Sequence, residues 1–369
     1  MLEQKLETVA AVVAANAVEV DRTAAFPTKN LEALASAGLL GLVSATNVGG
    51  QGKGLAEAVQ VVERLARECG STAMVVCMHY CATAMIEAHG SDDVRGAIAA
   101  GKHLATLAFS EPGSRSQFWA SLNTATLDGA NVRLTGKKSF VTSAHHADSY
   151  VWSSKPTAGN EMSTLWFVPR TTAGLRVDGN FDGLGLRGND SAPITAEDAK
   201  VPASNRLGGD GAGFGIMMST VLPWFNVLSA SVSAGLMEAA VERTAKHAAG
   251  TKFEHAGSAI ADLPTARAFI ARMRIKTDQT KSLNTDTLAA MGANRADTML
   301  RVLESKAAAG EAAAEVADIA MRVCGGAAFR KDVGVERVFR DARAALVMGP
   351  TTDVLYDFIG KAVCGLPLF

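Results

Sequence analysis

The sequence predicts an α+β protein built from three regions, because the spacing of its hydrophobic residues changes twice along the chain. Apolar residues recur at helical spacing up to about residue 103 and again after about residue 211, whereas short β-rich runs separated by turns fill the part between. Helices and strands that are segregated along the chain are typical of α+β architectures. We therefore expect an N-terminal helical domain (1–103), a middle β domain (104–210) and a C-terminal helical bundle (211–369).

Helical periodicity in the first region is interrupted once, at the segment NVGGQGKG (47–54). Its glycines indicate a turn between helices. A phosphate-binding loop is excluded there, since no strand precedes the segment and no Lys-Ser/Thr pair follows at the required spacing. The periodic positions are Leu31, Leu34 and Leu39, followed by Val59, Val62 and Leu65.

Four runs in the middle region are rich in β-branched and aromatic residues and end at Gly, Asp or Pro. They cover residues 104–111, 130–144, 147–155 and 163–169, and each predicts a strand. After Gly213 the chain is Ala-rich and helical, with breaks expected near Gly250, Gly292 and Gly325-Gly326. The helix expected over 296–323 should pack in an antiparallel bundle.

Composition restricts the partners and the compartment of this 369-residue chain. With 36 basic and 37 acidic residues the net charge is −1, and no basic stripe suits a nucleic acid. We find no basic leader and no run of about 18 apolar residues, and expect a cytoplasmic protein without membrane insertion. Five cysteines without CxxC spacing predict reduced, buried thiols, and we expect no metal site.

Several motifs then point to a family. The segment FSEPGSRS (109–116) resembles the TEPGAGS signature of acyl-CoA dehydrogenases, and FVTS (140–143) resembles their WITN segment. Five further motifs occur in the same order as in that family: LGLRG (184–188), VP (201–202), GAGF (211–214), RVCGG (322–326) and RDA (340–342). The resemblance covers nearly the whole chain. It implies an N-terminal helical domain, a middle β-barrel and a C-terminal four-helix bundle, with FAD as cofactor.

The resemblance assigns FAD-binding positions in two places. Phe140 would supply the aromatic wall of the flavin in place of the usual tryptophan, and Thr142 a donor; in a strand the two would point to one face. Ser110 would donate to the pyrimidine side. The other assigned residues are Phe109 and Thr351. Gly325 and Gly326 would let the backbone approach the adenosine of FAD, and Arg322 or Lys252 of a partner subunit would meet its pyrophosphate.

The sequence departs from the family at its catalytic base. Where the family carries a glutamate after RDA this chain has Gly349, and the alternative position for that glutamate reads about Phe225. Asp353 is a candidate base, but the favoured interpretation is that it complements the dipole of a helix that begins there. His79 is a second candidate, with a satisfied core histidine as the other interpretation. His145 and His146 either lie near the flavin or belong to a solvated loop.

Two enzymatic functions remain open at this point, and a third, weaker interpretation is a non-catalytic FAD-binding paralogue. Ser116 keeps a position linked to the thioester tail, and this together with the length of the resemblance favours a flavin enzyme acting on an acyl thioester by dehydrogenation or elimination. Phe225 and Asn226 would line the substrate pocket and make it bulkier and less charged, because Asn226 stands about where the family has an arginine. The alternative is an oxygen-using flavin monooxygenase acting on a small aromatic or amine substrate, which needs no α-proton base. The family implies a homodimer or homotetramer with FAD between subunits.

Overall fold

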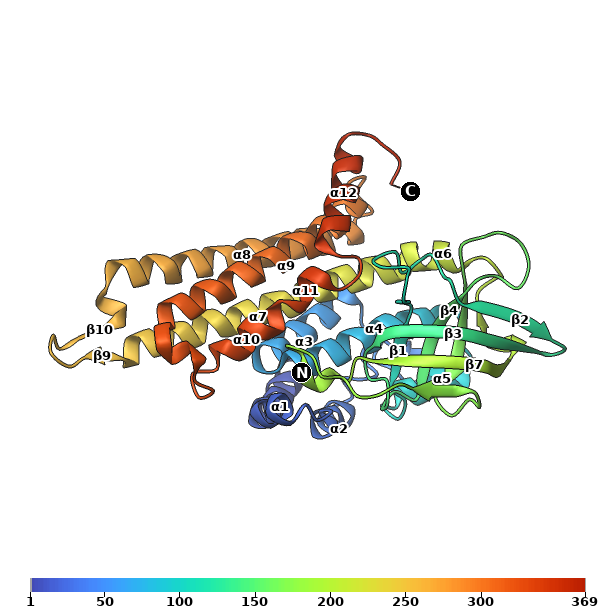
Figure 1. Ribbon diagram of the computed structural model, residues 1–369, viewed down its shortest axis with the longest axis horizontal. Coiled ribbons are helices and arrows are strands. Elements are labelled where there is room, and N and C mark those ends of the chain that lie inside the picture. Colours follow the sequence, from blue (N-terminus) through green and yellow to red (C-terminus); the bar gives the residue numbers. More distant parts are fainter. Residues whose placement is uncertain (1, 369) are drawn as a thin grey trace.

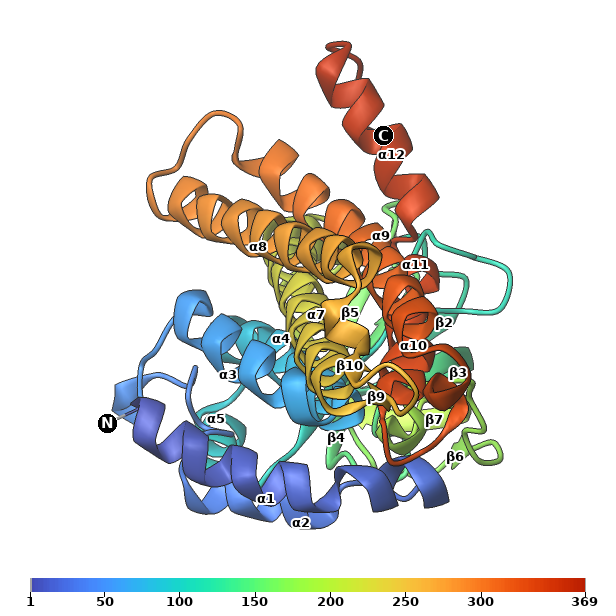
Figure 2. The same cartoon turned by 90° about the vertical axis from the view of Figure 1, so that its left-hand side faces the viewer.

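A computed structural model describes residues 2–368 and confirms the α+β class with its helical, β and helical regions (Figure 1). The molecule is elongated. Long helices occupy one end, the strands β1 to β8 occupy the other, and the first helices lie along one side of both (Figures 1 and 2).

The N-terminal region surrounds one buried helix. Helix α4 packs against α3, the first strand of the β region and the first long C-terminal helix, and nearly all its side chains are buried. It therefore connects the three regions. The helices are α1 (Leu2–Thr23), α2 (Thr28–Ser36), α3 (Leu55–Glu68), α4 (Gly70–His89) and α5 (Asp92–Ala99), and the expected turn contains a 3₁₀ segment, η1 (Thr46–Val48).

The middle region consists of two four-stranded sheets around one apolar core, which is the form that the predicted barrel takes. Their strand orders are β1-β4-β5-β8 and β2-β3-β7-β6. The strands are β1 (Ala105–Ala108), β2 (Thr124–Asp128), β3 (Asn131–Val141), β4 (Ser149–Ser154), β5 (Thr164–Pro169), β6 (Leu175–Val177), β7 (Ala192–Pro202) and β8 (Arg206–Leu207), with short turns η2 (Arg187–Asn189) and η3 (Ala203–Asn205).

Strand β3 is irregular at its end, and this corrects one expectation. Its pairing with β7 shifts register between Lys138 and Val141, and Phe140 takes a left-handed φ of 54°. Such a bulge re-aims a side chain. The Phe140 side chain is 74% exposed whereas Thr142, beyond the strand, is buried. The two are thus not alternate residues of a regular strand, as the sequence had suggested.

The C-terminal helices end where the glycines predict. The elements are α6 (Gly213–Ile216), the π-helical η4 (Met217–Val221), α7 (Leu222–Gly250), β9 (Lys252–Phe253), β10 (Ser258–Ala259), η5 (Ile260–Asp262), α8 (Pro264–Gly292), α9 (Thr298–Cys324), η6 (Gly325–Phe329), α10 (Val335–Ala342), α11 (Ala344–Val347) and α12 (Thr352–Val363). Helices α7, α8 and α9 pack against one another, and α10 and α12 pack on α9. Gly235 allows α7 to approach α3 closely, since a Cβ there would lie 2.2 Å from the Glu63 carbonyl oxygen.

The continuous helical stretch Gly213–Gly250 is long and apolar enough to cross a membrane by length and composition, so the statement that no such run exists was wrong. In the structure these apolar residues pack in the protein core. In the most apolar window 67% of the residues are buried, and α7 packs against α3, α8 and α9. The run is the central core helix of the bundle.

A buried ion pair holds the loop that follows β1. The Lys138 ammonium contacts the Glu111 carboxylate and also donates to the Ser153 carbonyl at 2.8 Å. The second Glu111 oxygen accepts the backbone N–H groups of Leu122 and Asn123, at 2.6 and 3.1 Å. Residues 111–123 are therefore fastened at both ends by one carboxylate.

We expect Lys138→Met to lower the free energy of unfolding by about 3–5 kcal/mol, because it leaves the Glu111 carboxylate buried without a counter-charge. Urea denaturation measures this. The matched control is Lys200→Met, which removes a half-exposed lysine paired with Asp128 and should cost about 0–1 kcal/mol. Equal losses in the two variants would contradict the role given to the buried pair.

Candidate functional site

A large cavity lies where the three regions meet. It has a volume of about 1090 Å³ and a mainly apolar lining drawn from α4, the loops after β1 and β3, the segment before η2, the start of α7 and the segment around α11. Eight of the residues selected from the sequence line it: Phe109, Ser110, Ser116, Phe140, Thr142, Phe225, Gly349 and Thr351.

One wall of the cavity carries the exposed ring of Phe140 together with a small polar group. The hydroxyls of Thr142 and Ser191 lie 3.1 Å apart, and both residues line the cavity. Asn189 lines it as well, and its buried Oδ1 accepts no hydrogen bond from the residues that the structure describes. Because buried polar atoms are normally paired, this oxygen is available to a ligand donor.

The segment 344–351 forms another part of the lining. Its Thr351 N–H donates to the Ser116 hydroxyl at 2.9 Å, so these two cavity residues contact each other directly. The Gly349 N–H has no acceptor among residues 2–368. A Cβ at Gly349 would come no closer than 3.6 Å to its nearest neighbour, the Ser116 carbonyl oxygen, which is an ordinary contact.

Lys306 holds this segment in place, and sequence reasoning missed it. Its fully buried ammonium donates to three backbone carbonyls, those of Ala345 at 3.2 Å, Met348 at 3.0 Å and Pro350 at 2.7 Å. No carboxylate among the described residues lies within ion-pair distance of it. A lysine within an Ala-rich helical run gave no signal, because its acceptors lie about 40 residues further along the chain.

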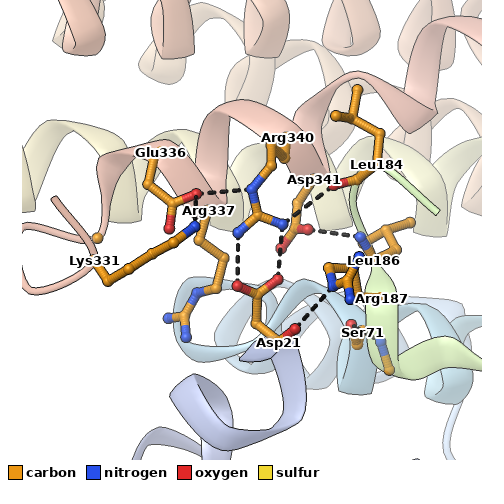
Figure 3. Close-up of polar contacts among 12 residues, drawn as sticks. Asp21, Ser71, Leu184, Leu186, Arg187, Lys331, Glu336, Arg337, Arg340 and Asp341 are labelled. Atoms are coloured by element: carbon orange, nitrogen blue, oxygen red, sulfur yellow. Dashed lines mark hydrogen bonds and ion pairs between the residues drawn. The ribbon is translucent and has the colours of Figure 1, made fainter. Parts of the chain in front are cut away.

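A polar joint connects the cavity wall to all three regions (Figure 3). Arg340 of α10 contacts both carboxylate oxygens of Asp21 in α1, at 2.8 and 2.6 Å, and donates to the Leu184 carbonyl at 3.2 Å. The adjacent Asp341 accepts the Leu186 N–H at 2.6 Å. Burial raises the pKa of Asp341 to about 6. The joint fixes the loop 183–186, which lines the cavity.

The cavity offers no free general base. Among residues 2–368 its lining contains one carboxylate, Glu111, which is engaged with Lys138 and two backbone N–H groups. The lining contains three arginines but neither a histidine nor a tyrosine. Carbonyl binding is therefore better supported than proton abstraction.

The structure does not bring His79 or Asp353 to the cavity, which corrects both proposals for the base. His79 is buried in α4, where its Nδ1 accepts the Ala105 N–H and its Nε2 lies 3.1 Å from the Leu40 carbonyl oxygen. Burial lowers the pKa of His79 to about 4, so the ring is neutral and structural. Asp353 is exposed in the first turn of α12, where a carboxylate complements the helix dipole.

Three more candidates lie outside the cavity. Asn226 is buried and donates to the Val302 carbonyl at 3.2 Å, so it joins α7 to α9 and does not reach the cavity. The His145 Nδ1 lies 2.8 Å from the Asp190 carboxylate. The His146 ring stacks on Phe26 at 4.0 Å. Neither histidine is part of the lining.

Arg322, Gly325 and Gly326 lie away from the cavity, at the end of α9. The Arg322 guanidinium lies 4.7 Å from the centre of the Phe269 ring, near the start of α8. This end of the bundle carries β9 and β10 and is opposite the β region (Figure 1). Within one chain these three residues do not meet the other candidates.

Three family descriptions match consecutive parts of the chain: the acyl-CoA dehydrogenase N-terminal domain over residues 1–100, the middle domain over 106–199 and the C-terminal domain over 211–364. Together with the fold, they show that the chain belongs to the acyl-CoA dehydrogenase superfamily of oxidoreductases.

Similar proteins agree in length as well as in fold. Acryloyl-CoA reductase (NADH) of Anaerotignum propionicum is 28% identical, over 94% of this chain and 89% of that protein. Cyclohex-1-ene-1-carbonyl-CoA dehydrogenase of Syntrophus aciditrophicus is 27% identical, over 95% and 86%. The structure of butyryl-CoA dehydrogenase from Megasphaera elsdenii superimposes with a TM-score of 0.90 at 21% identity, covering 98% of each chain.

We expect ligand binding in the cavity to depend on the protonation of Lys306. Burial lowers the pKa of Lys306 to about 7. The ammonium below that pH has three N–H donors for its three carbonyls, whereas the neutral amine above it has two, so one carbonyl is released as the pH rises. Acyl-thioester binding, measured by spectral titration, should weaken from about pH 6 to about pH 8.5.

The variant Lys306→Met should remove this pH dependence and weaken binding at low pH. Lys276→Met, which removes an amine paired with Glu315 on the surface of the bundle, should keep the native profile. A profile in Lys306→Met that still falls through about pH 7 would exclude Lys306 as its origin.

Proposed function

We propose that this chain is an FAD-dependent oxidoreductase that acts on an acyl thioester such as an acyl-CoA. The observation that carries the proposal is the cavity itself. Phe140, Thr142, Gly349 and Ser116 all line this one mainly apolar space. The names of the relatives, which concern acryloyl-CoA and cyclohex-1-ene-1-carbonyl-CoA, support the thioester class.

The cavity residues are suited to a flavin. The exposed Phe140 ring gives an apolar face, and the unpartnered Asn189 oxygen, Thr142 and Ser110 give polar groups of the kind that contact the edge of an isoalloxazine. When bound, FAD would supply two-electron redox chemistry, since such cofactors carry the chemistry and the protein positions them. Phe140, Thr142, Ser110 and Thr351 would hold it.

The remaining residues would bind and orient the thioester. The unpaired Gly349 N–H is available to the thioester carbonyl oxygen, Phe225 would border the acyl group, and Ser116 contacts Thr351 in the same lining. Among residues 2–368, no lining side chain is free to accept an α-proton. Both dehydrogenation and elimination of a β-substituent remove that proton, so we propose a substrate that carries its own base. The relatives named above give no support to a monooxygenase.

We also propose a homo-oligomer. If Arg322, Gly325 and Gly326 bind FAD, they can do so only for the cavity of a second copy, because they lie at the opposite end of their own chain. A closed dimer or a dihedral tetramer provides that arrangement. The charge balance and the buried apolar helices are consistent with the expected cytoplasmic location.

The catalytic proposal predicts a gain of function. Gly349→Glu should accelerate anaerobic bleaching of the flavin by a simple acyl-CoA by about 10²–10⁴-fold, which is the usual contribution of a positioned base. The space at Gly349 admits a Cβ without a clash. Stopped-flow absorbance of the FAD-loaded protein measures the rate.

Gly349→Gln is the matched control, because it has the same size and no basic carboxylate. It should leave the slow native rate unchanged. The proposal fails if Gln accelerates bleaching as much as Glu, or if the native protein is already as fast as the Glu variant.

The oligomer proposal predicts that Arg322→Gln weakens FAD retention although Arg322 does not line its own cavity. Fluorescence of released FAD measures the dissociation constant, and analytical ultracentrifugation gives the assembly state. Arg330→Gln, a nearby exposed arginine paired with Asp332, should retain FAD normally. A monomer that keeps FAD in the Arg322 variant would contradict the proposal.

A further inference from the structure

A second cavity, of about 600 Å³, lies next to the first and is strongly basic. Helix α1, the loop before η2, α7 and the segment leading into α10 form its walls. Six cationic side chains and three acidic ones line it. The cationic residues are Arg22, Arg187, Arg243, Lys331, Arg337 and Arg340.

The three acidic residues already have cationic partners. Both carboxylate oxygens of Asp21 accept from Arg340, and Glu336 contacts Arg340 at 2.7 Å and Lys331 at 3.0 Å (Figure 3). Asp332 pairs with Arg330 outside the lining. Within the part of the chain that the structure describes, the lining therefore has no spare carboxylate for its other cations.

Two of these cations, Arg243 and Arg337, form no ion pair with any residue that the structure describes. Arg337 donates to the Glu68 carbonyl at 3.0 Å, and Arg243 donates to the carbonyls of Gly334 at 2.9 Å and Arg67 at 3.5 Å. In Figure 3 the Arg337 side chain runs beside Asp21 without a drawn contact. Each guanidinium thus keeps unused N–H donors in a cavity wall.

Electrostatics in this cavity favour an anion. Burial and, secondarily, repulsion by Arg337 lower the pKa of Arg243 to about 10. The acids that act on Arg243 are already engaged: Glu68 pairs with Arg64, Glu242 pairs with Arg67, and Asp341 accepts the Leu186 N–H. A bound anion would relieve the repulsion between the two guanidiniums.

We infer that this second cavity binds a ligand with a phosphate or diphosphate group. Guanidinium groups pair with phosphate oxygens through two parallel N–H donors, and two of them converge here with Lys331 and Arg187. Gly183, Leu184 and Arg340 line both cavities, so a ligand in one lies against the wall of the other.

The test is isothermal titration of the FAD-loaded native protein with inorganic diphosphate. We expect saturable binding that weakens as salt rises, with no loss of flavin absorbance. Arg337→Gln and Arg243→Gln should each weaken it by about tenfold or more. The control Arg176→Gln, which removes an exposed, ion-paired arginine of β6, should bind normally. Thermal melting first establishes that each variant is folded. If a glutamine variant is not folded, Arg337→Lys takes its place, because lysine keeps the positive charge but lacks the two parallel N–H donors of the guanidinium.

Absence of binding to the native protein, undiminished binding in both glutamine variants, or release of FAD in proportion to the bound diphosphate would each overturn the inference. Competition by CoA that is lost in the same variants would identify the phosphate as part of a thioester carrier, whereas competition by ADP alone would identify a free nucleotide. The inference stands apart from the proposed reaction, because diphosphate binding requires no flavin reduction.

Discussion

The Arg340 guanidinium lies where the helical, β and C-terminal regions converge, and its flat array of N–H donors binds all three. It contacts the Asp21 carboxylate from α1, the Glu336 carboxylate one turn back in α10 and the Leu184 carbonyl from the middle region (Figure 3). Gly185 passes so close that a Cβ would lie 2.3 Å from the Arg340 carbonyl oxygen. The joint therefore sets the wall between the two cavities, and each depends on it for shape.

Two buried lysines likewise hold the loops around the main cavity through polar contacts. Lys138 acts through Glu111 on residues 111–123, and Lys306 acts directly on the carbonyls of 345–350. The Ser116 hydroxyl and the Thr351 N–H then join the two loops. The position of the Gly349 backbone is thus fixed by contacts that do not involve a side chain at that residue. The segment therefore keeps its position although residue 349 has no side chain.

Much of the site was predictable because it is carried by short motifs on neighbouring stretches of chain. The segment 109–116 and the residues Gly349 and Thr351 could be selected from the sequence, and they line one cavity. Selection failed where a side chain's partners come from distant segments. His79 is satisfied by two backbone groups, Asn226 by a neighbouring helix, and the three acceptors of Lys306 follow it by about 40 residues.

The sequence by itself determined the order of helical and β regions, the helix ends at Gly250 and Gly292 and the absence of a glutamate at residue 349, because periodicity, glycine punctuation and residue identity are local properties. Tertiary structure decided which polar groups remain free. The bulge that exposes Phe140 and the pairing that leaves Arg243 and Arg337 without carboxylates depend on register and on contacts across regions. Such contacts follow from the packing of whole elements, which no local pattern encodes.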